Sequence, residues 1–117
     1  MWLFCKSGFF SAVQHNSQPE LIHVRARFAS DLERLCQAHG VTTAVKHTPG
    51  HDYAYRMDFP REVWANIVKA EAEAIDYDNF KAAVHDNSAR DHAYMGCWLA
   101  LRNAQEKTAK DDLNKQA

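Results

Sequence analysis

The sequence lacks the residue patterns on which several common functional sites depend. It has only four glycines, and none of them belongs to a glycine-rich phosphate loop. Cys5, Cys36 and Cys97 lie far apart in the chain, which excludes a disulfide framework and a paired-cysteine metal site. No serine stands in a Gly-x-Ser-x-Gly motif. We therefore expect a protein that is not an enzyme and that uses no cofactor.

The chain also lacks a strong net charge and a long apolar run. Its formal charge of −1 is unlike that of a strongly basic nucleic-acid binder or a densely acidic DNA mimic. No segment approaches the ~20 apolar residues that cross a bilayer. The apolar start, MWLFC, is interrupted at once by Lys6, Ser7 and Gly8, unlike a signal peptide. We expect a cytoplasmic protein without membrane contact.

Alternation of apolar and polar residues predicts the strands. Residues 2–5 and 9–14 suit two short strands, or one strand bent at Gly8. Residues 21–28 form the clearest strand, with His23, Arg25 and Arg27 on the face opposite the apolar residues. Residues 41–46 and 53–59 predict a hairpin around a Pro-Gly turn.

Helical periodicity predicts helices over residues 31–39, 60–75, 80–85 and 89–105, the last with Tyr94, Cys97, Trp98 and Leu101 as its buried stripe. The element order predicts an α+β fold, with an antiparallel sheet of four to five strands and helices packed on one face. A ferredoxin-like relative is the nearest common architecture. We expect one domain over residues 1–106 and a polar, frayed tail over residues 107–117.

Several motifs resemble those of one family. The opening MWLF, the GFFS that follows, the HVRARF strand, the segment DYAYR, the YDNFK stretch and the later Tyr94-to-Trp98 spacing are similar to those of an uncharacterised family of small bacterial proteins. The resemblance covers most of the chain up to about Leu101. The resemblance implies that this part of the chain forms one domain, and it implies no activity.

The stretch IDYDNFK brings two carboxylates close together at residues 76 and 78. An acid–base pair would need two carboxylates held apart in a cleft with separated pKa values. We interpret the stretch instead as a joint between helices. Asp78 is the expected helix cap, accepting from backbone amides that have no partner in the helix.

Two histidines, His47 and His51, flank the Pro-Gly turn of the predicted hairpin. A structural zinc ion takes four ligands and a catalytic zinc ion three, so this pair leaves the ligand set incomplete. Exposed loop histidines are commoner than ligands. We expect no metal site.

Arg25 and Arg27 project from one predicted strand and Arg56 from another, opposite the apolar faces. If the two strands are neighbours, these arginines converge into an anion-binding site for a nucleotide or nucleic acid. The alternative is a solvated face whose arginines pair with acids of the tail or last helix, such as Asp91. Base stacking on this face is disfavoured because Tyr53 and Tyr55 are expected to point inward.

The N-terminal strands carry many aromatic residues for their length, namely Trp2, Phe4, Phe9 and Phe10. Surplus apolar surface on a small domain is typical of a protein interface. Our first hypothesis is therefore an interaction module that contacts a protein partner or a second copy of itself, such as a small bacterial or phage regulator. The alternative hypothesis is the anion-binding module.

Overall fold

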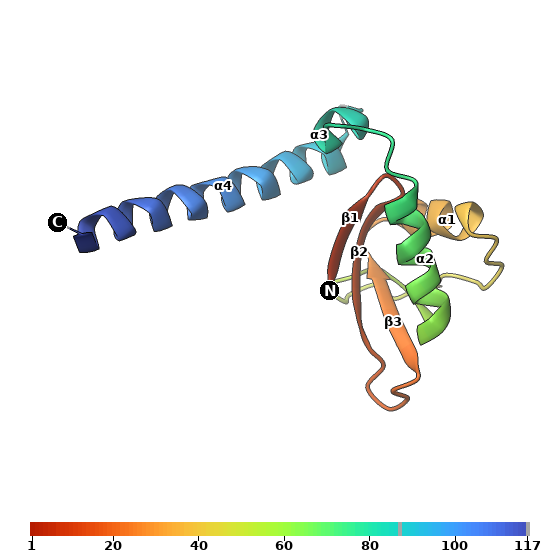
Figure 1. Ribbon diagram of the computed structural model, residues 1–117. Coiled ribbons are helices and arrows are strands. Elements are labelled where there is room, and N and C mark those ends of the chain that lie inside the picture. The colour runs from red at the N-terminus through yellow and green to blue at the C-terminus, as the bar shows by residue number, and fades with distance from the viewer. Residues whose placement is uncertain (87, 117) are drawn as a thin grey trace. The chain divides into compact units, whose positions relative to one another are not determined.

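The structure is a computed structural model that describes residues 1–86 and 88–116. The chain divides into two compact units, Met1–Asp76 and Tyr77–Ala117 (Figure 1), and we describe each by itself. The sequence had predicted one domain over residues 1–106.

The first unit contains a five-stranded antiparallel sheet. Its strands are β1 (Trp2–Cys5), β2 (Gly8–Gln14), β3 (Leu21–Ala26), β4 (Lys46–His47) and β5 (Tyr55–Pro60). They lie in the order β1-β2-β3-β5-β4, and each adjacent pair is antiparallel. The predicted α+β fold with an antiparallel sheet is confirmed. The predicted Pro-Gly hairpin forms between β4 and β5, although β4 is shorter than expected.

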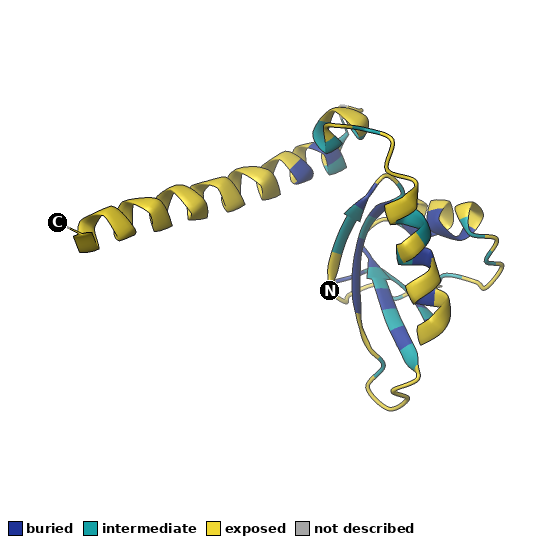
Figure 2. Cartoon of the chain, in the orientation of Figure 1, coloured by how far each residue is buried: buried dark blue, intermediate teal, exposed yellow. Residues whose placement is uncertain are grey.

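Two helices, α1 (Ala29–Ala38) and α2 (Arg61–Glu73), cover one face of this sheet. Leu32 and Leu35 of α1 and Trp64 of α2 belong to the same buried cluster as Phe10 and Val24 of the sheet. The alternation along β3 places Ile22, Val24 and Ala26 in this core, as Figure 2 shows by the change between buried and intermediate residues. Burial of this apolar cluster supplies the main driving force for folding.

The turn between β1 and β2 is fixed by a contact with α1. Gly8 has φ +151°, and a Cβ atom built on it would lie 2.3 Å from Cγ of Asp31. The Asp31 side chain is only 1% exposed; one carboxylate oxygen accepts from the Phe9 amide at 3.1 Å, and the other accepts from Arg34 at 2.6 Å. This buried carboxylate joins the start of β2 to α1.

The second unit consists of α3 (Phe80–Ala83) and α4 (Ala89–Gln116). Phe80 stacks on Tyr94 at 5.9 Å between ring centroids, and the Lys81 ammonium lies 3.8 Å from the centroid of Trp98. Tyr94 is buried as predicted, but Cys97, Trp98 and Leu101 are exposed. Residues 107–116, expected to be frayed, continue α4 as helix.

No helix in the described part of the chain is long and apolar enough to cross a membrane.

Candidate functional site

A line of side chains crosses the sheet on the face that α1 and α2 leave uncovered. Trp2 lies opposite Ser11, and Ser11 lies opposite Arg25. Arg25 in turn lies opposite Arg56, which lies opposite Lys46. Residues directly opposite one another on antiparallel strands project to the same face. We call these five residues the cross-strand row.

Arg25, in the middle of the row, is held without a carboxylate. Its Nη2 donates to Oγ of Ser11 at 2.8 Å, and its guanidinium carbon lies 4.7 Å from the centroid of the Tyr53 ring. Its Nε is buried and has no hydrogen-bond partner among the described residues. A buried donor without a partner is unfavourable, and no carboxylate compensates the charge of this guanidinium within hydrogen-bond distance among the described residues.

Arg27 lies just beyond the end of β3 and is exposed. Its Nη1 donates to the backbone oxygen of Asp52 at 2.7 Å, and its guanidinium carbon lies 4.3 Å from the Tyr53 centroid. Tyr53, which we expected to point inward with Tyr55, is buried at 4% exposure, but it lies against these two arginines and outside the main core cluster. This difference arises because Tyr53 precedes β5, so strand alternation does not fix its direction.

Arg56 is bonded mainly to neutral groups. Its Nε donates to Oγ1 of Thr48 at 3.1 Å, and its Nη1 lies 3.4 Å from Nε2 of His23. The nearest carboxylate oxygen, Oδ1 of Asp52, lies 3.7 Å from Nη2, and the Asp52 side chain is 71% exposed. The Arg56 side chain is 19% exposed, but a pair of this length with its carboxylate in solvent contributes little, on the order of 0–1 kcal/mol. The guanidinium charge is thus only weakly compensated.

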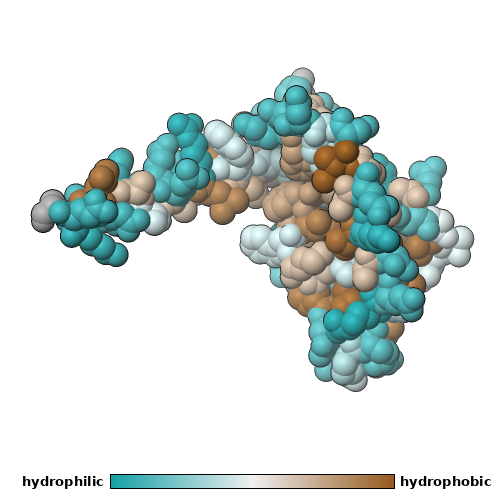
Figure 3. All heavy atoms as spheres, in the orientation of Figure 1, coloured by the Kyte–Doolittle hydropathy of each residue, from teal (hydrophilic) through white to brown (hydrophobic). Residues whose placement is uncertain are grey.

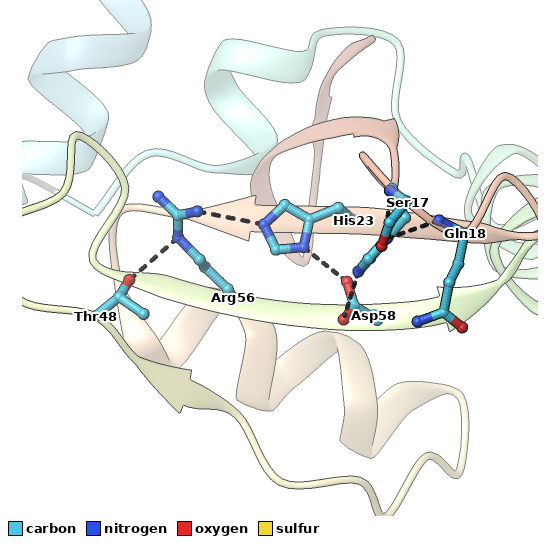
Figure 4. Close-up of polar contacts among 7 residues, drawn as sticks. Ser17, Gln18, His23, Thr48, Arg56 and Asp58 are labelled. Carbon is cyan, nitrogen blue, oxygen red and sulfur yellow. Dashed lines mark hydrogen bonds and ion pairs between the residues drawn. The ribbon is translucent and has the colours of Figure 1, made fainter.

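His23 links Arg56 to the second carboxylate of the site, as Figure 4 shows. Nδ1 of His23 lies 2.6 Å from Oδ1 of Asp58, and Nε2 of His15 lies 3.9 Å from the other oxygen of Asp58. When Nδ1 donates its proton to Asp58, Nε2 is left as the acceptor that faces Arg56. Asp58 therefore orients the imidazole and does not contact the guanidinium directly.

A cavity of about 290 Å³ opens beside Arg56. Its lining is rich in polar side chains: His23, Thr43, Lys46, Thr48, Arg56 and Asp58, together with Ala44 and Met57. This volume lies near the lower end of the range for small-molecule sites, ~300–1,000 Å³. Two cations and two hydroxyl groups in one cavity suit an oxyanion.

The charges around the row do not balance. Arg25, Arg27, Arg56 and Lys46 carry four positive charges, against the two carboxylates of Asp52 and Asp58. The expected alternative partner, Asp91, is paired with His85 at 2.6 Å in the second unit. The three predicted arginines thus meet around Tyr53 and Thr48, with an excess of positive charge.

The aromatic residues at the N-terminus divide between the two faces of the sheet. The Trp2 and Phe9 rings meet edge to face at 6.0 Å, and the Phe4 and Phe9 rings lie 4.5 Å apart, on the open face. Phe10, predicted as an interface residue, is fully buried and packs 6.5 Å from Trp64. Phe10 is therefore a core residue, because successive strand residues point to opposite faces.

The IDYDNFK joint contains a helix cap, but at a different residue from the predicted one. Oδ1 of Asn79 accepts from the amide of Ala82 at 3.0 Å, and α3 begins at Phe80. Asp78, the predicted cap, lies one residue too early for this bond. Asp76 instead pairs with Lys6 at 3.1 Å on the surface of the first unit.

Two further reactive side chains, Cys5 and His47, are each held by neighbouring groups of the first unit. Burial raises the pKa of the Cys5 thiol to about 11, with the Glu71 carboxylate as the next cause, so the thiol stays protonated at neutral pH. His47 stacks on Tyr55 with 4.9 Å between ring centroids. Within residues 1–86 and 88–116, no group of three metal-binding side chains could hold an ion.

No protein-family model matches this chain, and no curated protein or solved structure is detectably similar to it. The resemblance to small bacterial proteins therefore stays a prediction.

Three members of the site were not predicted from the sequence. Ser11 shares the outward face of β2 with Phe9, and the two-residue alternation could have placed it there. Thr48 and Tyr53 lie in the β4–β5 connection, where no periodic pattern signals direction. Their contacts with the guanidiniums depend on the tertiary structure.

Proposed function

We propose that this protein is a non-enzymatic binding module that recognises phosphate-bearing ligands, nucleotides or nucleic acid, on the open face of its sheet. The observation that carries the proposal is the set of three guanidiniums, Arg25, Arg27 and Arg56, held mainly by neutral groups, with one carboxylate oxygen of Asp52 3.7 Å from Arg56. Guanidinium forks bind phosphate oxygens in bidentate geometry. An anion would supply the missing negative charge.

The site is also organised before any ligand arrives. Arg25 and Arg27 lie against the Tyr53 ring, and Arg56 is held by Thr48 and His23. Groups that are already positioned lose less conformational entropy on binding. This supports a binding role for the face over a merely solvated one.

The test is isothermal titration with ATP and with inorganic tripolyphosphate at low and high salt. We expect Arg27→Glu and Arg56→Glu each to weaken binding at least tenfold. Lys69→Glu is the matched control, because Lys69 is an exposed residue of α2 and causes the same change in net charge. Equal effects of Arg56→Glu and Lys69→Glu would show that only net charge matters and would overturn the proposal.

A second function is favoured by one observation. Trp2 is 71% exposed on β1, which is an edge strand of the sheet. Figure 3 shows hydrophobic side chains gathered over β1 beside the hydrophilic outer surface of α2. Self-association through Trp2 and Phe9 would cover this surface and add a strand beside β1.

Analytical ultracentrifugation over a range of protein concentrations tests this second function. Self-association should persist at high salt and be lost in Trp2→Ser. Leu101→Ser is the control, because Leu101 is also highly exposed, at 73%, but belongs to α4. A protein that stays monomeric at every concentration would exclude self-association.

A further inference from the structure

We infer that the ligand is a single-stranded nucleic acid that lies along the cross-strand row, with a base stacked on Trp2. This inference rests on the proposed anion-binding function and specifies the ligand. It starts from the order of residues in the row, which begins with an aromatic ring on β1 and ends with three cations on β3, β5 and β4. A single strand carries both matching features, bases and phosphates.

The geometry of the row suits a linear ligand that touches its two ends, because Ser11 between them is 1% exposed and is bonded to Arg25. The row crosses all five strands, and neighbouring strands lie about 4.8 Å apart, so it is about 19 Å long. Stacked nucleotides advance about 3.4 Å each along one strand, so about six nucleotides match this length. Fewer nucleotides are needed when the strand is extended.

The aromatic end of the row is suited to base stacking. Trp2 is 71% exposed, and its ring is supported by the edge-to-face contact with Phe9. The Phe4 ring lies 4.5 Å from the Phe9 ring, measured between centroids. Every base has a π-face, so such a platform binds bases with little sequence preference. A duplex, whose bases are stacked on one another, could not use it.

The cationic end supplies phosphate contacts in sequence. Arg25 and Arg56 are adjacent in the row, and Lys46 follows on the edge strand β4 at the cavity. Arg27 lies beside the row, with its guanidinium carbon 4.3 Å from the centroid of the Tyr53 ring. If three or four of these cations contact phosphates, the logarithm of the affinity should fall against the logarithm of the salt concentration with a slope of about −2 to −3.

The experiment measures fluorescence anisotropy of end-labelled oligothymidylates of three to twelve nucleotides and of an oligouridylate of six. A duplex of the same length and inorganic polyphosphate serve as competitors. The variants are Trp2→Ala and Trp2→Phe, which preserves an aromatic face. Leu101→Ala is the control for removal of an exposed apolar side chain.

We expect affinity to rise up to about six nucleotides and then level off. Trp2→Ala should lose roughly 5- to 150-fold in oligonucleotide affinity, the range typical of removing one stacking side chain, and should bind polyphosphate unchanged. Trp2→Phe should retain most of the affinity. Oligonucleotide should also quench tryptophan emission in the wild-type protein, and Trp2→Phe should abolish that quenching. The inference is supported if either the oligothymidylates or the oligouridylate bind in this way.

Other results separate the inference from the proposed function. Equal binding of polyphosphate and of oligonucleotides, with no effect of Trp2→Ala, would overturn the single-strand ligand and leave the anion site standing. Preference for the duplex would do the same. If neither ligand responds to Arg27→Glu or Arg56→Glu, the proposed function itself is wrong.

Discussion

Substitution of Gly8 by alanine should be the most destabilising glycine replacement in this protein. The new Cβ would lie 2.3 Å from Cγ and 2.6 Å from Oδ2 of Asp31, and the backbone has φ +151°. Overpacking costs about 1–3 kcal/mol, and a backbone conformation reserved for glycine about 1–3 kcal/mol more. Relief of the clash would displace the carboxylate that binds the Phe9 amide. We expect a loss of about 4 kcal/mol in the free energy of unfolding.

Alanine substitutions at two other glycines separate the contribution of backbone strain from that of the steric clash. Gly40 has φ +67° but nothing within 4 Å of its Cβ position, so Gly40→Ala should cost only about 1 kcal/mol through backbone strain. Gly96 lies inside α4 with open space around it, so Gly96→Ala should stabilise the helix by about 1 kcal/mol.

Urea denaturation gives these free energies. Circular dichroism follows the helices, and the emission of Trp64, which is 6% exposed, follows the core of the first unit. If Gly8→Ala lowers the free energy of unfolding no more than Gly40→Ala does, then the Asp31 side chain moves away from the new Cβ atom without a measurable loss of stability. The contact between Asp31 and Gly8 would then not be what fixes the β1–β2 turn.

The remaining predictions concern the helix cap and the thiols. Asn79→Ala should destabilise the second unit by about 1 kcal/mol, because it removes the bond to the Ala82 amide, whereas Asp78→Ala should leave the thermal melt nearly unchanged; the reverse order would restore Asp78 as the cap. Exposed Cys97 should react with a maleimide at neutral pH well before buried Cys5, and mass spectrometry of the labelled peptides would show equal rates if Cys5 were accessible. The folded pKa of Cys5, about 11, lies above its ordinary value of 9.0, so this thiol should contribute stability below pH 9 that is lost as the pH rises toward 11. Melting temperatures of the wild type and Cys5→Ala, measured from pH 8 to 11, should converge as the pH rises; a constant difference would contradict this.

The strands of the open face could be predicted because alternation determines which way each strand residue points. His23 and Arg25 project opposite Val24, as their positions in the sequence indicate. The pairing of Arg25 with Arg56 could not be predicted without the order of the strands in the sheet. β5 lies beside β3, although α1 and β4 separate these two strands in the sequence. The strand order depends on how α1 and α2 together cover the apolar face of the sheet, and no short stretch of the sequence indicates that arrangement.

Where two adjacent residues could serve the same role, sequence reasoning chose wrongly. Phe9 and Phe10 are chemically identical and both were predicted at the interface, which is wrong for Phe10, because the start of β2 at Gly8 turns Phe10 toward the core. Asp78 and Asn79 are both good caps, and the first helical residue decides between them. Tyr53 was misplaced because it lies outside β5, where the loop and its contacts with Arg25 and Arg27 set its direction.

The most direct test of the anion site is an NMR titration that follows the arginine Nε–H signals as ATP is added. We expect saturable shifts for Arg25, Arg27 and Arg56, with the buried Nε of Arg25 among the most affected. Arg34, which is bonded to Asp31, serves as an internal control and should not shift. Equal shifts at all arginines, or none at Arg25, Arg27 and Arg56, would contradict a phosphate-binding role for this face.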